Sequence, residues 1–337
     1  MPCLRREESQ NPKTQTTTET SRTESFGDPL EFLQSLRGEE KSAVFAIQTE
    51  IFRVMTDKLV QKGFRWILPV ILSKATDPLW PDPGTSIEKR IELDIYGQNV
   101  KTMQSMIIHK RVLVSLGPDR FFILSPNIRI ETNERAKTGK HLYEFTQLEI
   151  EIAHAKMEDI FKLFEDLIEA SLSTVREECC KELELLGRDL KVPTEPFKVY
   201  KRTELEQRYG TKWVEAATRE SSNPVWVTDL PREFYDYEDE KTGAWRNFDL
   251  LLPEGFGEVL SGAEREYEYD RITQKLHRDG LDEREYALML RLAKDRTLKP
   301  SAGAGLGVER LLGYVCGVDH ISKVQPFPRV PGTVLDL

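Results

Sequence analysis

Residues 301–310, Ser301-Ala-Gly-Ala-Gly-Leu-Gly-Val-Glu-Arg310, form the most informative segment of the chain, and Gln325-Pro-Phe-Pro-Arg329 follows shortly after. Glycine has no Cβ, so such a segment can approach a flat base and let a helix pack closely. Arg310 offers a planar, permanently charged fork to a phosphate or an adenine ring. With Gly307 and Arg310 as contacts, the segment indicates a site for a purine triphosphate. The alternative is a Gly-rich turn into an ordinary helix with a surface arginine.

Composition limits the classes of protein that the chain can belong to. The 337 residues are 39% hydrophobic, enough for a substantial core, and carry a formal charge of −9 with a pI near 5.4. This acidic balance disfavours tRNA or DNA as a partner, because a nucleic-acid backbone attracts basic surfaces. No apolar run long enough for a membrane span and no targeting pattern occurs, so we expect a cytoplasmic protein without membrane contact. The four cysteines lack CxxC spacing, which predicts reduced thiols and no zinc.

Two regions differ sharply in hydropathy. Residues 1–27 are polar and predict a disordered tail, whereas residues 28–337 predict one catalytic domain. Apolar spacing in that domain indicates a helix over 43–62 and a strand over 64–72, in which Pro69 favours a sheet edge or subunit interface. Further patterns predict strands at 92–98, 121–131, 142–153, 225–230, 247–252 and 257–260, and helices at 105–116, 157–186 and 267–298. This irregular rhythm favours an α+β fold, an antiparallel sheet flanked by helices.

The strand over 142–153 predicts one polar face. Alternation places Phe145, Gln147 and Glu149 opposite Leu148 and Ile150. If the strand before it pairs antiparallel, Arg129 and Glu131 lie beside that polar face together with His141. Arg129 would then bind an α-phosphate while Phe145 stacks under adenine. A solvated, charged hairpin is the alternative.

Two other clusters indicate binding chemistry. Asp249 and Glu258 occupy predicted strands, and paired carboxylates can hold Mg²⁺ against polyphosphate oxygens. Gln104 and Lys110 lie on a segment that could present a cation to a carboxylate substrate. Surface acids and a solvated lysine are the corresponding alternatives.

In this order, the clusters resemble the signature motifs of class II aminoacyl-tRNA synthetases of the aspartyl and asparaginyl branch, over about residues 40–332. Gly63-Phe64 with Pro69 resembles the first motif, Arg129 to Phe145 the second and Gly303 to Arg310 the third. The resemblance implies an ATP site of Arg129, Glu131, His141, Phe145, Glu258, Gly307 and Arg310, with Mg²⁺ on Asp249 and Glu258. It implies a substrate site of Asp77, Gln104, Lys110, Ser261 and Arg265, and a homodimer. Asp77, which stands where the aspartyl enzymes have an acid near the substrate amine, could instead be a turn acid before Pro78.

The nearest likeness is to archaeal asparagine synthetase-related proteins, in which an N-terminal anticodon-binding barrel is missing. Phrases such as Thr76-Asp-Pro-Leu-Trp-Pro-Asp-Pro83 and Pro231-Arg-Glu-Phe-Tyr-Asp236 support it. The chain departs from the aspartyl synthetases at Gln104-Ser-Met-Ile107, where those enzymes have Gln-Ser-Pro-Gln, which leaves the amino-acid substrate open.

The residues and the resemblance together predict an AMP-forming amide ligase that acts without tRNA. ATP would activate the side-chain carboxylate of aspartate, Arg129 and Arg310 would stabilise charge on the phosphoryl oxygens, and ammonia would attack to give asparagine. Another amine acceptor, another amino acid, a regulatory amino-acid-binding paralogue and a synthetase that needs a separate tRNA-binding partner are the alternatives.

Overall fold

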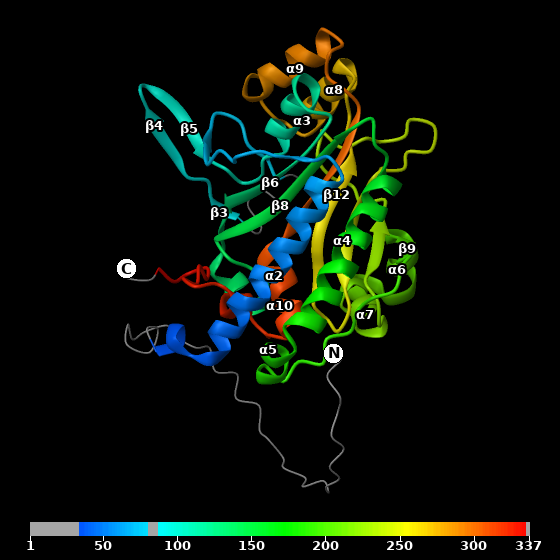
Figure 1. Ribbon diagram of the computed structural model, residues 1–337. Helices are drawn as coiled ribbons and strands as arrows, with labels where there is room; N and C mark the ends of the chain where they lie inside the picture. The colour runs from blue at the N-terminus through cyan, green and yellow to red at the C-terminus, as the bar shows by residue number, and fades with distance from the viewer. Residues whose placement is uncertain (1–33, 80–86, 335–337) are drawn as a thin grey trace, which may run out of the picture.

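An eight-stranded sheet forms the centre of the computed structural model, which describes residues 34–79 and 87–334 (Figure 1). The spatial order is β1 (Arg65–Trp66), β6 (Arg120–Ile128), β8 (Glu144–Ala153), β13 (Ser301–Gly307), β12 (Gly257–Glu264), β11 (Asn247–Leu252), β10 (Val225–Thr228) and β9 (Lys198–Lys201). The outermost pair at each edge is parallel and every other pair is antiparallel. The predicted α+β class with an antiparallel sheet is therefore confirmed.

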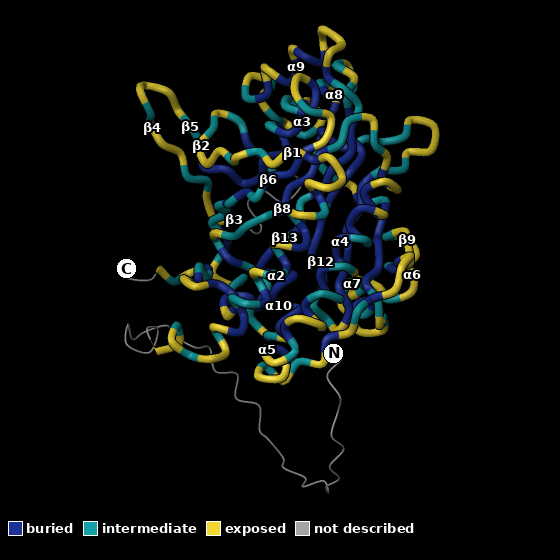
Figure 2. The backbone as a smooth tube through the Cα atoms, viewed as in Figure 1, coloured by how far each residue is buried: buried dark blue, intermediate teal, exposed yellow. Residues whose placement is uncertain are grey.

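Three helices cover one face of this sheet, α2 (Glu39–Gln61), α4 (Met157–Glu178) and α10 (Val308–Cys316) (Figure 1). Their apolar stripes pack against the inward side chains of the central strands to form the main hydrophobic core. Helix α2 buries Ile47, Ile51 and Leu59, as the helical spacing predicted, and the chain leaves it through Gly63 at a φ of +81°. Figure 2 shows the central strands mostly buried, whereas the edge strand β9 is largely exposed.

A second hydrophobic cluster lies at one end of the molecule, where α3 (Ile107–Leu116), α8 (Tyr269–Arg278) and α9 (Ala287–Lys294) meet (Figure 1). It includes the fully buried Phe234 and the nearly buried Tyr235. These helices close off one end of the sheet's polar face. The remaining pieces are the two-stranded sheet of β3 (Ile87–Lys89) and β7 (Ile130–Glu131), and the small sheet of β2 (Leu72–Ser73), β5 (Gln98–Thr102) and β4 (Glu92–Ile95). The short helices α5 (Cys180–Leu185), α6 (Arg202–Tyr209) and α7 (Trp213–Glu220) complete the fold.

Several predicted boundaries were wrong. The strand expected over 64–72 consists of two short strands, β1 and β2, although β1 does lie at a sheet edge. The strand expected at 92–98 is the β4–β5 hairpin, which turns at Tyr96 and Gly97 with positive φ at both. The long helix expected over 267–298 is interrupted between α8 and α9, and that over 157–186 at Cys179. The predicted tail over 1–27 lies outside the described residues.

The Gly-rich segment is a central strand, β13, and not a turn. An added Cβ at Gly303 would lie 2.0 Å from Glu151 Oε2 and 2.3 Å from the carbonyl oxygen of Ile150. Glycine is therefore required here because the neighbouring strand's buried carboxylate occupies the space. Within the two described ranges, no helix combines the length and apolar character needed to cross a bilayer.

Candidate active site

Strand alternation places the candidate site on the face of the sheet opposite the main core. Along β8, Gln147, Glu149 and Glu151 point to this face, whereas Leu148 and Ile150 enter the core. The register pairs Glu149 with Gly305 and Glu151 with Gly303 on β13. The predicted alternation of this strand is thus confirmed, and the glycines opposite the two acids leave room above the sheet for the side chains of β8.

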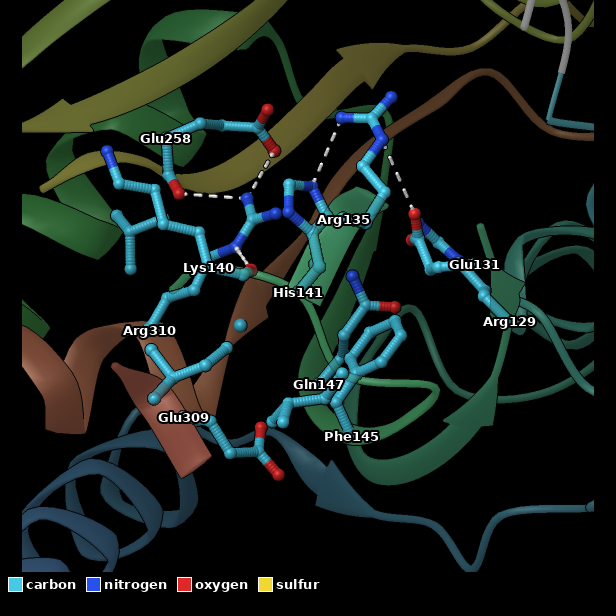
Figure 3. A pocket seen from close by; sticks show the side chains of 15 residues that line it. Arg129, Glu131, Arg135, Lys140, His141, Phe145, Gln147, Glu258, Glu309 and Arg310 are labelled. Carbon is cyan, nitrogen blue, oxygen red and sulfur yellow. Dashed lines mark hydrogen bonds and ion pairs between the residues drawn. The ribbon is translucent and has the colours of Figure 1, made fainter. Parts of the chain in front are cut away.

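A cavity of about 270 Å³ lies at one end of this face (Figure 3). All seven residues assigned to ATP line it, together with others that include Arg135, Lys140, Gln147, Gly305 and Glu309. Arg129 lies over the Phe145 ring, with 5.2 Å from its Cζ to the ring centroid, and its Nε donates to the carbonyl of Gln104 at 3.0 Å. Arg310 donates from Nη1 to the carbonyl of Glu258 at 2.9 Å and from Nε to that of Lys140 at 3.2 Å. Backbone carbonyls therefore hold both guanidinium groups at the cavity wall.

His141 is neutral in this cavity. Burial, reinforced by the charges of Arg310, Arg135 and Lys140, lowers the pKa of His141 to about 3. Its Nδ1 lies 2.6 Å from Thr138 Oγ1, and its Nε2 lies 3.5 Å from Arg135 Nη1. Because a guanidinium can only donate, Nε2 is the acceptor and Nδ1 carries the proton. The positive charge of the cavity comes from its arginines and Lys140.

A second cavity, of about 230 Å³, adjoins the first, and Arg129, Gln147, Glu258 and Gly305 line both. The substrate residues Asp77, Lys110, Ser261 and Arg265 line it, as do residues without a predicted role: Glu149, Arg232, Glu233, Tyr235 and Asp236. Gln104 was assigned to substrate and does not line either cavity. Its backbone N–H donates to Thr76 Oγ1 at 2.9 Å and its carbonyl accepts from Arg129, so it supports the wall from behind.

Buried carboxylates fix the two cations predicted to bind substrate. Lys110 Nζ lies 2.5 Å from Glu149 Oε2 and 3.7 Å from Glu151 Oε2. Arg265 contacts Glu151 through Nε at 3.3 Å and Asp236 through Nη1 at 3.2 Å. Although burial alone would raise it, Arg265 and Lys110 hold the pKa of Glu151 below its usual value. This network presents two immobilised positive groups to the cavity.

The two carboxylates assigned to Mg²⁺ differ in their access to the cavities. Glu258 lines both cavities, whereas Asp249, which pairs with Ser261 across β11 and β12, is buried and lines neither. Arg232 Nη2 binds Asp249 Oδ2 at 2.5 Å, while Oδ1 is buried without a hydrogen bond to any described residue. Hard oxygen donors of this kind fit Mg²⁺ when phosphate oxygens complete its coordination. The part of the chain that the structure describes contains no cluster of three or more potential metal ligands.

Sequence reasoning missed the roles of Lys140, Arg232, Glu233, Tyr235 and Asp236. The last four belong to the phrase Pro231-Arg-Glu-Phe-Tyr-Asp236, which was singled out only for its resemblance. The sequence did contain a signal for this group. Charged and aromatic residues are mixed shortly after strand β10, where a loop can project side chains over the sheet.

Comparison with known proteins gives a consistent relationship over this whole region. The family model described as tRNA synthetases class II (D, K and N) matches residues 30–331. The asparagine–tRNA ligase of Thermoplasma acidophilum is 28% identical over 315 residues, which cover 87% of this chain and 70% of that enzyme. The aspartate–tRNA(Asp/Asn) ligase of Methanopyrus kandleri is 31% identical over 314 residues, covering 87% and 69%. Asparaginyl-tRNA synthetase from Pyrococcus horikoshii, solved with asparaginyl-adenylate, superposes with a TM-score of 0.82 at 26% identity, covering 92% of this chain and 74% of that one.

Proposed function

The chain belongs to the class II tRNA synthetases (D, K and N), whose members form amino-acid adenylates, and from this premise we propose that it transfers the activated acyl group to a small amine without tRNA. In its most specific form, the proposal is synthesis of asparagine from aspartate, ATP and ammonia, with AMP and pyrophosphate as the other products. The observation that carries the adenylation step is the contact between the two cavities, which share Arg129, Gln147, Glu258 and Gly305.

The proposed reaction has two steps at this shared wall. A carboxylate oxygen of the amino acid in the second cavity attacks the α-phosphorus of ATP in the first. A new P–O bond forms, and the bond to the β-phosphate breaks to release pyrophosphate. The amine then attacks the acyl carbon, a C–N bond forms, the C–O bond to AMP breaks, and the amine nitrogen loses its extra proton.

The side chains have defined tasks in this scheme. Arg129 and Arg310 are held by backbone carbonyls and keep further N–H groups for phosphoryl oxygens, which is the arrangement that stabilises developing charge without reorganisation. The Phe145 ring lies beneath the Arg129 guanidinium in the same cavity. Its flat apolar surface would lie against adenine. Asp249 and Glu258 would hold Mg²⁺, which when bound would neutralise charge on the phosphate oxygens.

Aspartate suits the second cavity because one of its two carboxylates can be bound while the other reacts. Lys110 and Arg265 would hold the α-carboxylate, and Asp77 the α-ammonium group. The side-chain carboxylate would then extend toward the shared wall and react. The formal charge of −9 supports a small acceptor over a polyanionic one.

Aminoacylation of tRNA is the second candidate, and the names of the relatives favour it. Product analysis separates the two. The purified protein is incubated with ATP, Mg²⁺ and aspartate, with ammonium or with tRNA, and the products are measured by mass spectrometry. Asparagine with stoichiometric AMP supports the amide ligase. Aminoacyl-tRNA without asparagine supports the synthetase, and absence of AMP in all reactions contradicts both.

We also propose that two copies of the chain pair through the region of β1. Trp66, Leu68 and Ile71 expose 54%, 83% and 49% of their surfaces next to this sheet edge. Neighbouring exposed apolar side chains favour burial against a partner. Light scattering coupled to size-exclusion chromatography should give twice the mass of the chain, and Leu68→Glu should halve it.

A further inference from the structure

One corner of the second cavity is formed by Asp77, Glu233 and Tyr235. Building on the proposed function, we propose that Glu233 and Tyr235 in this corner bind the acceptor as a cationic amine, beside the α-ammonium of the amino acid on Asp77, and that Glu233 accepts its proton. Ammonium is the smallest ligand of this class.

The carboxylate of Glu233 is uncommitted. It makes no hydrogen bond or ion pair with another side chain in residues 34–79 and 87–334, and its neighbour Arg232 binds Asp249 and Ser261. Asp236, by contrast, is held by Arg265 Nη1 at 3.2 Å and Asn247 Nδ2 at 3.1 Å. Glu233 is therefore available to a ligand, whereas Asp236 belongs to the network that fixes Arg265.

Tyr235 provides a second and independent indication of a ligand. Its side chain lines the cavity and the residue is only 6% exposed, yet its hydroxyl makes no hydrogen bond with any described residue. A side chain that is nine-tenths buried and lines a cavity leaves such a hydroxyl to a ligand or water in that cavity. An amine N–H that donates to this oxygen would satisfy it.

The charge balance of the cavity also fits a second cation. Its lining contains five carboxylates (Asp77, Glu149, Glu233, Asp236 and Glu258) and four basic groups (Lys110, Arg129, Arg232 and Arg265). The α-ammonium of an amino acid requires one acid, and Asp77 suffices for it. Burial, followed by the charges of Asp77 and Asp236, raises the pKa of Glu233 well above its usual value, while Arg232 opposes this shift. An adjacent ammonium group would favour the ionised carboxylate instead.

The resulting step balances in atoms and charge. The cationic amine transfers one proton from nitrogen to the Glu233 carboxylate, and the nitrogen lone pair then attacks the acyl carbon of the adenylate. The C–N bond forms, and the C–O bond to AMP breaks with its electron pair remaining on AMP. The second nitrogen proton passes to solvent. Tyr235 would orient the amine through its hydroxyl oxygen.

Glu233→Gln tests this assignment, because it keeps the shape of the side chain and removes the proton acceptor. Adenylation is followed by aspartate-dependent ATP–pyrophosphate exchange without amine, and transfer by amide formation with ammonium. General-base catalysis typically contributes about 100-fold or more, so the ratio of transfer to exchange should fall at least about tenfold. Hydroxylamine, which is uncharged at neutral pH, should show a much smaller loss. Glu233→Asp should recover part of the ratio, and the exposed Glu240→Gln is the matched control.

Other outcomes would overturn the assignment. An unchanged ratio, or equal losses with ammonium and hydroxylamine, would exclude Glu233 as the proton acceptor. Equal losses of exchange and transfer would instead make it a residue of the amino-acid site. Tyr235→Phe should raise the KM for ammonium more than it lowers kcat, and an unchanged KM would remove Tyr235 from the subsite. Failure of the proposed function is recognised separately, because the unsubstituted protein would then exchange pyrophosphate without forming an amide with any amine.

Discussion

Replacing Gly303 with alanine should destabilise the protein far more than the same change two residues later. Both glycines lie on β13, and neither has a positive φ, so the backbone itself accepts alanine at each position. At Gly303 the new Cβ would lie 2.0 Å from Glu151 Oε2 and 2.3 Å from the Ile150 carbonyl oxygen. At Gly305 its nearest neighbour would be Gln147 Nε2, at 3.1 Å, which is the end of a flexible side chain. Only the first substitution forces a rigid, buried group to move.

The structure sets the size of the effect. Overpacking a buried site costs about 1–3 kcal/mol, and uncoupling one member of a buried ion pair costs about 3–5 kcal/mol. Glu151 is fully buried and joined to Arg265, Lys110 and Ser301, so its displacement would weaken this whole network. A partial shift of Glu151 suggests a loss of about 3 kcal/mol for Gly303→Ala, whereas Gly305→Ala should cost less than about 1 kcal/mol.

Urea unfolding, monitored by tryptophan fluorescence, measures the difference directly. A loss of about 3 kcal/mol should also lower the melting temperature by about 4 °C in a chain of this size. Equal unfolding midpoints for the two variants would refute the reasoning, because they would mean that Glu151 can move without a loss of free energy of unfolding. Gly305→Ala should instead weaken ATP binding, because Gly305 lines both cavities.

The remaining predictions concern ionisable side chains. Lys110→Met should cost about 3–5 kcal/mol in urea unfolding because it leaves Glu149 unpaired, and adding Glu149→Gln should recover part of that loss; no recovery would contradict the pairing. Arg129→Lys should lower pyrophosphate exchange about 100-fold, while Arg120→Lys, outside both cavities, should leave it unchanged. With its pKa at about 3 against 6.5 when unfolded, His141 should produce no step in calorimetric ATP affinity between about pH 5 and 8. Stability relative to His141→Gln should instead fall as pH drops below 6.5, because the unfolded chain takes up the proton first.

Local periodicity predicted the parts of the site that lie along a single strand. Phe145, Gln147 and Glu149 share a face because the strand period is two, and this relation needs no knowledge of neighbouring strands. The same argument correctly placed Leu148 and Ile150 in the core. Helix α2 was equally predictable, because its apolar stripe repeats with the helical period.

Contacts between distant segments could not be predicted in this way. The pairing of Lys110 with Glu149 depends on how α3 packs over β8, and that of Glu151 with Gly303 on the register between β8 and β13. A register shift of one residue would turn both acids into the core. Glycine at 303 was therefore interpreted as space for a nucleotide, although the structure uses it as space for Glu151.

The two cavities differ in charge in a way that would order the proposed reaction. The first gathers Arg129, Lys140 and Arg310, which attract a triphosphate, whereas the second has an excess of carboxylates, which attract an amine. On this assignment, the acyl carbon lies at the wall between them, with its leaving group on the cationic side and its nucleophile on the anionic side. Adenylation would remove the negative charge of the substrate carboxylate. The repulsion between that group and the acids of the second cavity would then disappear. The neutral acyl carbon is also the better electrophile and AMP the better leaving group, so the amine would be transferred only after the first step has formed the adenylate.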